Sequence, residues 1–124
     1  MTTTVLVIDD DSGIRDLLEF KLERNGFEAV VGANGEECLE YLRSNPLPDL
    51  VVLDVAMPGM DGIETFEAID EEHGTDVPVV MLSGKSPDNR PTDGEIEPSA
   101  HLRKPFRMNE VISSIERVLD RDST

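Results

Sequence analysis

Short apolar runs alternate with amphipathic segments five times along this chain, and its fold class follows from that alternation. Several of the runs are continuous and rich in valine, which is typical of strands buried on both faces of a sheet. Repeated strand–helix alternation favours an α/β fold with a parallel sheet and right-handed crossovers. A length of 124 residues favours one domain. The five runs are Val5–Ile8, Phe27–Val31, Leu50–Val55, Val77–Leu82 and the weaker Ala100–Leu102.

The segments between the runs show helical spacing of apolar residues and recognisable start signals. We expect Ser12 to cap the first helix and Asn34 the second, because both side chains can accept a hydrogen bond from the first turn. Asp61 with Glu64 predicts a capping box for the third helix. A last helix is predicted near the end of the chain, with apolar residues at Val111, Ile112, Ile115, Val118 and Leu119.

The fourth connection, from Gly84 to Ser99, departs from this pattern. It contains three prolines and Gly94, and its only large apolar residue is Ile96. Each proline inside a helix costs about 3 kcal/mol and the glycine about 1 kcal/mol. Burial of one isoleucine contributes only about 1.5–3 kcal/mol. We therefore predict a degenerate fourth helix that is short, irregular or absent.

Charge limits the partners that the chain can bind. Its 27 acidic and 11 basic residues give a net charge of −16, which disfavours direct binding of nucleic acid or of an anionic membrane. Only three of the basic residues are lysines, and an acidic, lysine-poor composition is expected in a high-salt, halophilic cytoplasm. Cys38 is the only cysteine, so no internal disulfide forms. No secretory signal or membrane span is visible, and we expect a cytoplasmic protein.

Polar side chains follow the predicted strands where ligands bind in parallel α/β sheets. Asp9–Asp11 follow the first strand, Asp54 ends the third, Ser83 ends the fourth and Lys104 follows the fifth. Each of them alone has an ordinary structural explanation. The acidic triplet can be a solvated turn, Asp54 a turn former, Ser83 a helix cap and Lys104 a surface charge. Together, converging carboxylates need a cation, and their oxygens suit Mg²⁺ better than zinc or copper. Carboxylate, cation, lysine and hydroxyl are the groups needed for phosphoryl transfer to an aspartate.

These residues resemble the receiver domain of two-component response regulators. The resemblance is carried by Val5–Asp11, Leu50–Gly62, Val79–Gly84 and Lys104–Phe106, and it covers essentially the whole chain. It implies a doubly wound, five-stranded parallel sheet in the flavodoxin-like order 2-1-3-4-5, with helices on both faces. We expect one receiver domain over residues 1–124, able to stand alone because no output segment follows Thr124.

The resemblance implies a phosphoacceptor signalling domain rather than a conventional enzyme. Asp54 would accept a phosphoryl group from a histidine kinase or a phosphotransfer protein, through Mg²⁺-dependent self-phosphorylation, and would then lose it by autodephosphorylation. Ser83 would be the switch hydroxyl and Lys104 the cationic partner of the phosphoryl oxygens. Phosphorylation would switch binding of a downstream protein target that the sequence does not name.

The same resemblance implies a set of Mg²⁺ ligands. Asp10 and Asp54 would bind the ion directly, Asp9 mainly through water, and Ala56 through its backbone carbonyl. Asp11 is interpreted as a loop acid. Ala56 also occupies the position that helps place the hydrolytic water in the family, and alanine offers no group for this, so a long-lived aspartyl phosphate is expected.

His101 departs from the aromatic switch residue found three positions before the lysine in many members of the family. Two interpretations stay open: a pH-sensitive switch, or a surface histidine at the end of an edge strand. Cys38 lies at helical spacing and is interpreted as a core residue.

Other folds and functions with similar residues fit less well. A flavodoxin-type cofactor site fails because Asp9–Asp11 would repel the cofactor phosphate. A haloacid-dehalogenase-type phosphatase shares the Asp9-x-Asp11 pattern but lacks the threonine or valine that follows it. An EF-hand fails because Phe20 stands where the last loop glutamate belongs. The remaining alternative is a receiver-like interaction module that acts without phosphorylation.

Overall fold

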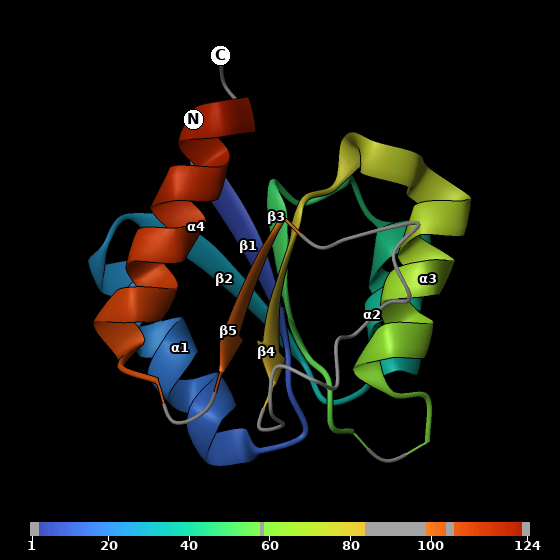
Figure 1. The fold of residues 1–124 in the computed structure, drawn as a ribbon, viewed down its shortest axis with the longest axis horizontal. Helices are drawn as coiled ribbons and strands as arrows, with labels where there is room; N and C mark the ends of the chain where they lie inside the picture. Colours follow the sequence, from blue (N-terminus) through green and yellow to red (C-terminus); the bar gives the residue numbers. More distant parts are fainter. Residues whose placement is uncertain (1–2, 58, 84–98, 104–105, 123–124) are drawn as a thin grey trace.

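A five-stranded, all-parallel sheet forms the centre of the molecule in the computed structural model, which describes residues 3–57, 59–83, 99–103 and 106–122 (Figure 1). The sheet order is β2-β1-β3-β4-β5, which confirms the predicted doubly wound, flavodoxin-like topology. The strands are β1 (Thr3–Ile8), β2 (Phe27–Gly32), β3 (Leu50–Asp54), β4 (Val79–Ser83) and β5 (Ala100–Arg103).

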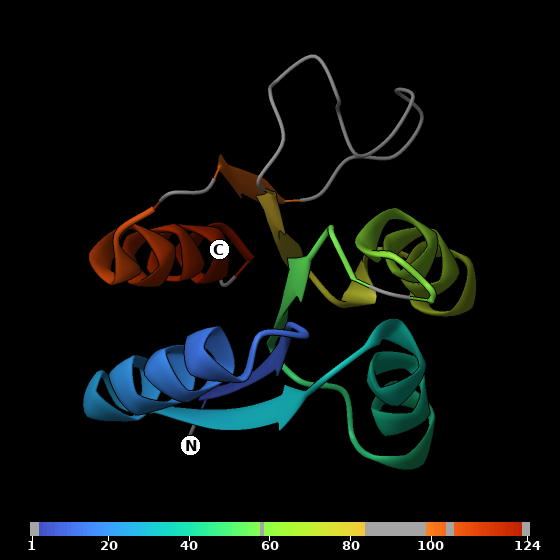
Figure 2. The same cartoon turned by 90° about the horizontal axis from the view of Figure 1, so that it is seen from below.

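Helices cover both faces of the sheet within the described residues. Helices α1 and α4 lie on one face, and α2 and α3 lie on the other (Figure 2). None of the helices in the described part of the chain is long and apolar enough to cross a bilayer. The helices are α1 (Ser12–Arg24), α2 (Gly35–Ser44), α3 (Gly62–His73), the short 3₁₀ helix η1 (Gly74–Asp76) and α4 (Met108–Asp122).

The core consists of two apolar layers, one on each side of the sheet. In β1, Leu6 and Ile8 face α2 and α3, whereas Val5 and Val7 face α1 and α4. Residues of β3 alternate in the same way, and all five of them are buried. Burial on both faces explains why the central strands read as continuous apolar runs rather than as alternating patterns. Cys38 of α2 is fully buried in the layer that contains Leu6, as predicted.

The helix starts agree with the sequence at two places and differ at one. Asn34 caps α2, accepting a hydrogen bond from the Glu37 amide at 2.8 Å, and Asp61 and Glu64 form the predicted capping box of α3. The prediction of Ser12 as a cap was wrong. Ser12 is already the first helical residue, and Asp11, with extended backbone, is the cap of α1. Asp11 Oδ1 accepts from the amides of Gly13 at 2.9 Å and Ile14 at 3.3 Å.

The connection from β3 to α3 packs against the end of its own strand. The Gly62 amide donates to the Val55 carbonyl at 2.9 Å. A Cβ atom at Gly62 would lie 2.3 Å from the Asp54 carbonyl oxygen and 2.5 Å from the Val55 Cα, distances that no side chain tolerates. Glycine at this position therefore lets α3 begin directly beside the end of β3. The degenerate helix predicted between β4 and β5 falls on residues 84–98, outside the described residues.

Candidate functional site

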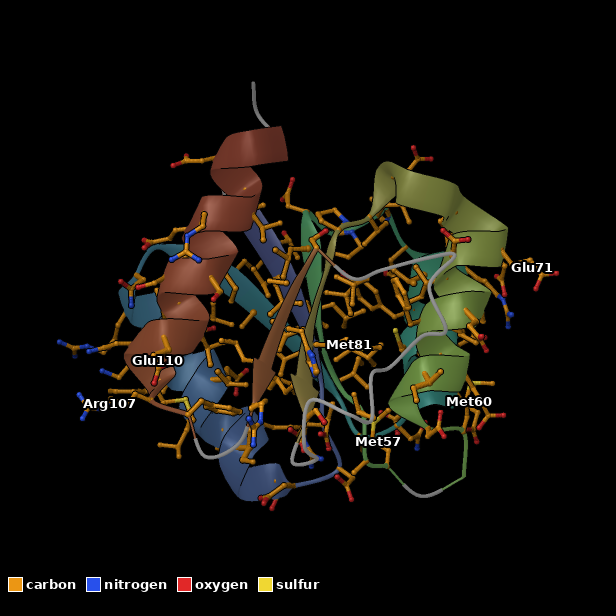
Figure 3. The ribbon with its side chains drawn as sticks, in the orientation of Figure 1. Met57, Met60, Glu71, Met81, Arg107 and Glu110 are labelled. Atoms are coloured by element: carbon orange, nitrogen blue, oxygen red, sulfur yellow. The ribbon has the colours of Figure 1, made fainter. Side chains whose placement is uncertain are left out.

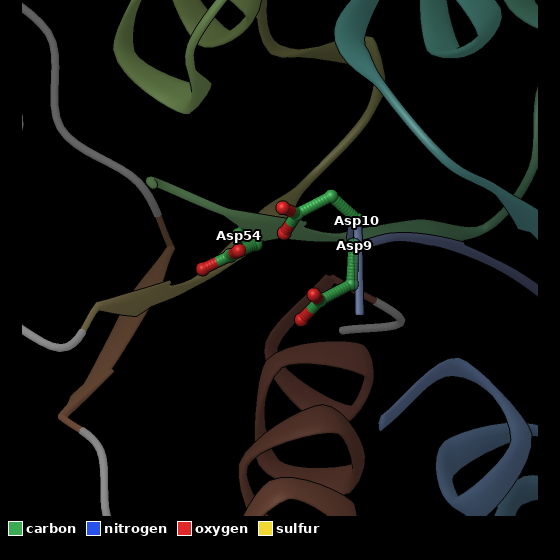
Figure 4. A group of neighbouring side chains, drawn as sticks. All are labelled: Asp9, Asp10 and Asp54. Carbon is green, nitrogen blue, oxygen red and sulfur yellow. The ribbon is translucent and has the colours of Figure 1, made fainter. Parts of the chain in front are cut away.

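Three carboxylates meet at the carboxyl edge of the sheet (Figure 4). Asp54 is the last residue of β3, and Asp9 and Asp10 follow β1 directly. Strands β1 and β3 are neighbours, with Ile8 paired to Leu53, so the residues that follow lie side by side. Each of the three side chains offers an oxygen atom, and these atoms all lie within 4.8 Å of one another. The structure thus brings together the three aspartates that the sequence predicted to converge.

Burial makes this group of aspartates electrostatically costly. Asp9 is 0% exposed and Asp54 is 1% exposed, whereas Asp10 is exposed. Two negative charges 4.8 Å apart repel each other by about 3 kcal/mol at an effective dielectric constant of about 20. A divalent cation among the carboxylates would turn this repulsion into attraction. The donor atoms are all oxygen, which is the ligand set that Mg²⁺ prefers, so the residues fit this ion.

The loop that carries Asp9 and Asp10 is fixed by backbone hydrogen bonds. The Asp9 amide donates to the Gly32 carbonyl at 3.2 Å, and Asp9 Oδ1 accepts from the Asp11 amide at 2.9 Å. Arg15 Nη1 of α1 donates to the Asp9 carbonyl at 2.7 Å. These contacts join the end of β2, the loop and the first turn of α1. They orient the Asp9 carboxylate before any ligand binds.

Sequence reasoning missed Arg15. Its guanidinium brings a cationic donor to the backbone of an acidic loop, in a part of the chain that otherwise carries only negative charge. The available signal was its position one helical turn after Asp11, the residue that ends the acidic triplet. Asp11 itself is not a member of the group that could hold an ion in the described part of the chain, because its side chain caps α1.

Asp54 and Ser83 come to the same edge on neighbouring strands. Asp54 pairs with Leu82, and Ser83 is the next residue of β4. The Val55 amide donates to the Leu82 carbonyl at 2.9 Å, which continues the pairing past Asp54. Ser83 is 2% exposed, whereas Ala56, two residues after Asp54, is exposed. Ser83 and the segment after Asp54 therefore lie at the same edge of the sheet as Asp54.

The fifth strand reaches this edge beside Ser83. Arg103, the last residue of β5, pairs with Ser83. Lys104 and Pro105 lie outside the described residues, so the predicted contact of Lys104 with a phosphoryl group stays a prediction. The exposed residue His101 lies on β5, an edge strand among the described residues. Partial desolvation of its ring, and then the charge of Arg103, lower the pKa of His101 below its ordinary value of 6.5.

Comparison with known proteins agrees with this fold. A sequence model of the response regulator receiver domain matches residues 5–116. The alkaline phosphatase synthesis transcriptional regulatory protein PhoP of Bacillus subtilis is 34% identical over 122 residues, which cover 98% of this chain and 50% of PhoP. The phosphate regulon transcriptional regulatory protein PhoB of Escherichia coli is 34% identical over 125 residues, 99% of this chain and 54% of PhoB. This chain spans about half the length of both relatives.

Solved structures give the same result. The receiver domain of Francisella response regulator 1452 superposes with a TM-score of 0.85 at 30% identity, covering 98% of this chain and 99% of that one. The response regulator TrrA of Thermotoga maritima, in complex with Mg²⁺-BeF, superposes with a TM-score of 0.82 at 28% identity, over 94% of this chain and 99% of that one.

Proposed function

Because this chain belongs to the response regulator receiver domain family, we propose that it accepts a phosphoryl group on Asp54 in the presence of Mg²⁺. The donor is a histidine kinase or a phosphotransfer protein. The observation that carries the proposal is the position of Asp54, almost fully buried at the end of β3 and within 4.8 Å of the carboxylate oxygens of Asp9 and Asp10. The solved complex of TrrA with Mg²⁺-BeF supports it by similarity.

Asp54 is the nucleophile of the proposed reaction. One of its carboxylate oxygens attacks the phosphorus atom of the donor, the phosphorus–nitrogen bond to the donor histidine breaks, and an aspartyl phosphate forms. The pairing of β3 with β1 and β4 holds this carboxylate at a fixed place, so little orientational freedom is lost when a donor arrives. Water later attacks the aspartyl phosphate, releases inorganic phosphate and restores the carboxylate.

The neighbouring residues hold the phosphoryl group and the ion. Asp9, Asp10, Asp54 and the Ala56 carbonyl are the proposed ligands of Mg²⁺, which when bound neutralises charge on the phosphoryl oxygens. The Ser83 hydroxyl donates a hydrogen bond to a phosphoryl oxygen, and Lys104 supplies a positive charge next to the phosphoryl group. A change at Ser83, which ends β4, is the proposed start of the switch in partner binding. The signal then passes through the loop after Ser83, or through the surface of α1 and α4.

The proposed unit is one receiver domain over residues 1–124, working in the cytoplasm. The strongly acidic composition supports a protein target rather than direct binding of nucleic acid or membrane, because a net charge of −16 repels phosphate-rich surfaces. The same composition supports a halophilic source. The upstream donor and the downstream target are proposed as proteins.

A titration with Mg²⁺ and beryllofluoride, a phosphoryl mimic, tests the proposal. Mg²⁺ alone should shift amide resonances near the three aspartates. Beryllofluoride should cause further shifts only when Mg²⁺ is present, with the largest changes near Asp54 and Ser83. Asp54→Asn should abolish the response, and Asp16→Asn, the same change at an exposed position of α1, should preserve it. If neither reagent shifts the amide resonances of the wild type, the result would support a receiver-like interaction module that acts without phosphorylation.

A further inference from the structure

The two helical layers of the molecule differ strongly in charge. Helices α2 and α3 together contain eight acidic residues and one arginine. Helices α1 and α4 together contain seven acidic and five basic residues. The acidic residues are spread along the sequence, but the topology places α2 and α3 on the same face of the sheet (Figure 2). One face is therefore much more negative than the other.

The single arginine of helices α2 and α3 is already engaged. Arg43 of α2 forms a two-point salt bridge with Glu72 of α3, with Nε–Oε1 at 2.9 Å and Nη2–Oε2 at 2.6 Å. The hydrogen bond and charge of Arg43 lower the pKa of Glu72. This bridge joins the two helices and engages the only arginine that they contain, although the charge of Arg43 also interacts with Glu40.

A groove opens on this acidic face between α2 and the sheet edge formed by β2 and β1. It encloses about 800 Å³. Its apolar lining includes Ile8, Leu39 and Met60, together with Val31, which is 39% exposed. Met60 lies two residues before α3, on the same side of the sheet (Figure 3). The groove thus presents apolar surface to solvent beside β2, which is an edge strand within the described part of the sheet.

Exposed carboxylates line one wall of this groove. Glu36 and Glu40 of α2 are both exposed and both line it. Glu40 accepts a hydrogen bond from the neutral Ser44 hydroxyl at 2.9 Å. Its charge also interacts with Arg43, which lines the groove too but whose guanidinium is already bound by Glu72. Glu37 has a different role, because its carboxylate accepts from the Ala33 amide at 3.1 Å and stabilises the start of α2.

We propose that this groove, lined by Val31, Glu36, Leu39, Glu40 and Met60, binds a cationic amphipathic segment of a partner protein. Apolar side chains of that segment would cover Val31 and Met60, and its lysines or arginines would reach Glu36 and Glu40. A second copy of this chain is a poor occupant, because two molecules with a net charge of −16 repel each other. The lining of the groove does not include Asp9, Asp10 or Asp54, so the proposal requires no phosphorylation of Asp54.

A synthetic peptide of alternating lysine and leucine, titrated into the unphosphorylated protein at about 0.15 M salt, tests the proposal by NMR. Amide shifts should concentrate at Val31, Glu36, Glu40 and Met60, and a glutamate–leucine peptide should cause none. Glu36→Gln/Glu40→Gln should weaken binding about 5-fold, because exposed ion pairs are worth a few-fold each. Glu67→Gln/Glu71→Gln removes the same charge from exposed positions of α3 outside the groove and should change affinity less than 2-fold.

Each other outcome overturns the proposal. Equal losses in the two double variants would mean that the peptide responds only to net charge. Shifts on α1 and α4, or no shifts at all, would mean that the groove is not a docking site. Shifts of the groove resonances with protein concentration alone would identify a second copy of this chain as the occupant. Because the peptide is tested without phosphorylation, a failure here leaves the proposed role of Asp54 untouched.

Discussion

Gly62 and Asp54 illustrate how single residues shape the site. Asp54 must lie at a fixed place at the end of β3, and the next element, α3, begins only eight positions later. That short connection brings the backbone of Gly62 against the Asp54 carbonyl, where a Cβ atom would lie at 2.3 Å. The atoms in the way are backbone atoms, which cannot move aside without moving the strand end.

We predict that Gly62→Ala destabilises the protein by about 1–3 kcal/mol, the usual cost of overpacking, and weakens Mg²⁺ binding by displacing Asp54. Gly13→Ala is the control, because the nearest atom to its added Cβ is the Asp11 carboxylate, at 3.2 Å. Urea unfolding and Mg²⁺ titration measure the two effects. If Gly62→Ala is as stable as Gly13→Ala, the close approach at Gly62 has no energetic consequence.

A second prediction at this scale concerns the pH response of His101. Its folded-state pKa is lowered by desolvation and by Arg103, so the unfolded chain takes up a proton first as the pH falls. The contribution of His101 to stability is therefore lost as the pH falls below about 6.5. An NMR titration of its ring proton should give a midpoint below that value, and Arg103→Gln should raise it. A midpoint above 6.5 would contradict the assigned environment.

At the scale of elements, α1 and the loop before it behave as one unit. Asp11 caps the helix with its side chain, and its amide is bound by Asp9 Oδ1. Arg15, inside the first turns of the same helix, donates to the Asp9 carbonyl. The start of the helix and the position of the Asp9 carboxylate therefore depend on the same few hydrogen bonds. A change in the cap should reach the site.

Asp11→Ala should cost about 1 kcal/mol, as is usual for loss of a helix cap. Asp11→Asn should keep most of that stability, because an amide oxygen can also accept from the Gly13 and Ile14 amides. Ser12→Ala should change stability by less than about 0.5 kcal/mol, because Ser12 is an exposed helical residue. Chemical unfolding of the three variants distinguishes the caps, and a larger loss at Ser12 than at Asp11 would reverse the assignment.

At the scale of the whole molecule, the sheet separates two surfaces with different chemistry. Its carboxyl edge carries the three aspartates of the candidate site. Its α2 and α3 face carries the excess of acidic residues and the groove beside β2. We propose that the first surface responds to a phosphoryl donor and that the second contacts a cationic partner.

Mg²⁺ should raise the melting temperature of the whole domain, because an ion that binds only the folded state stabilises it. At a Mg²⁺ concentration of 100 times Kd the gain is about 2.7 kcal/mol. Asp10→Ala should respond much less, since it lacks one ligand and has less repulsion to relieve. Scanning calorimetry at constant ionic strength measures both. A wild-type melting temperature that does not change up to millimolar Mg²⁺ would contradict the site.

The sequence predicted the fold well because its signals are local. Continuous valine-rich runs identify strands buried on both faces, and Asn34, Asp61 and Glu64 mark helix starts by side-chain chemistry. The cap of α1 was misassigned because Asp11 and Ser12 are both good caps, and only the backbone conformation chooses between them. The strand ends carrying Asp9 and Asp54 were found because parallel strands end at the same edge.

Other features depend on contacts between distant segments. The bond from Arg15 to the Asp9 carbonyl and the close approach of Gly62 to β3 exist only once the chain has folded. The acidic face formed by α2 and α3 could not be predicted from the sequence, because acidic residues occur along the whole chain. Only the topology of the sheet places α2 beside α3. The groove beside β2 likewise combines residues from β1, β2, α2 and the start of α3.

Intact-mass spectrometry after incubation with acetyl phosphate and Mg²⁺ tests most directly whether Asp54 is the phosphoacceptor. We predict one added phosphate on the wild type and on Asp16→Ala, a control at an exposed acid of α1, and none on Asp54→Ala or without Mg²⁺. Equal labelling of Asp54→Ala and the wild type, or a wild type that takes up no phosphate, would contradict the assignment of Asp54 as the phosphoacceptor.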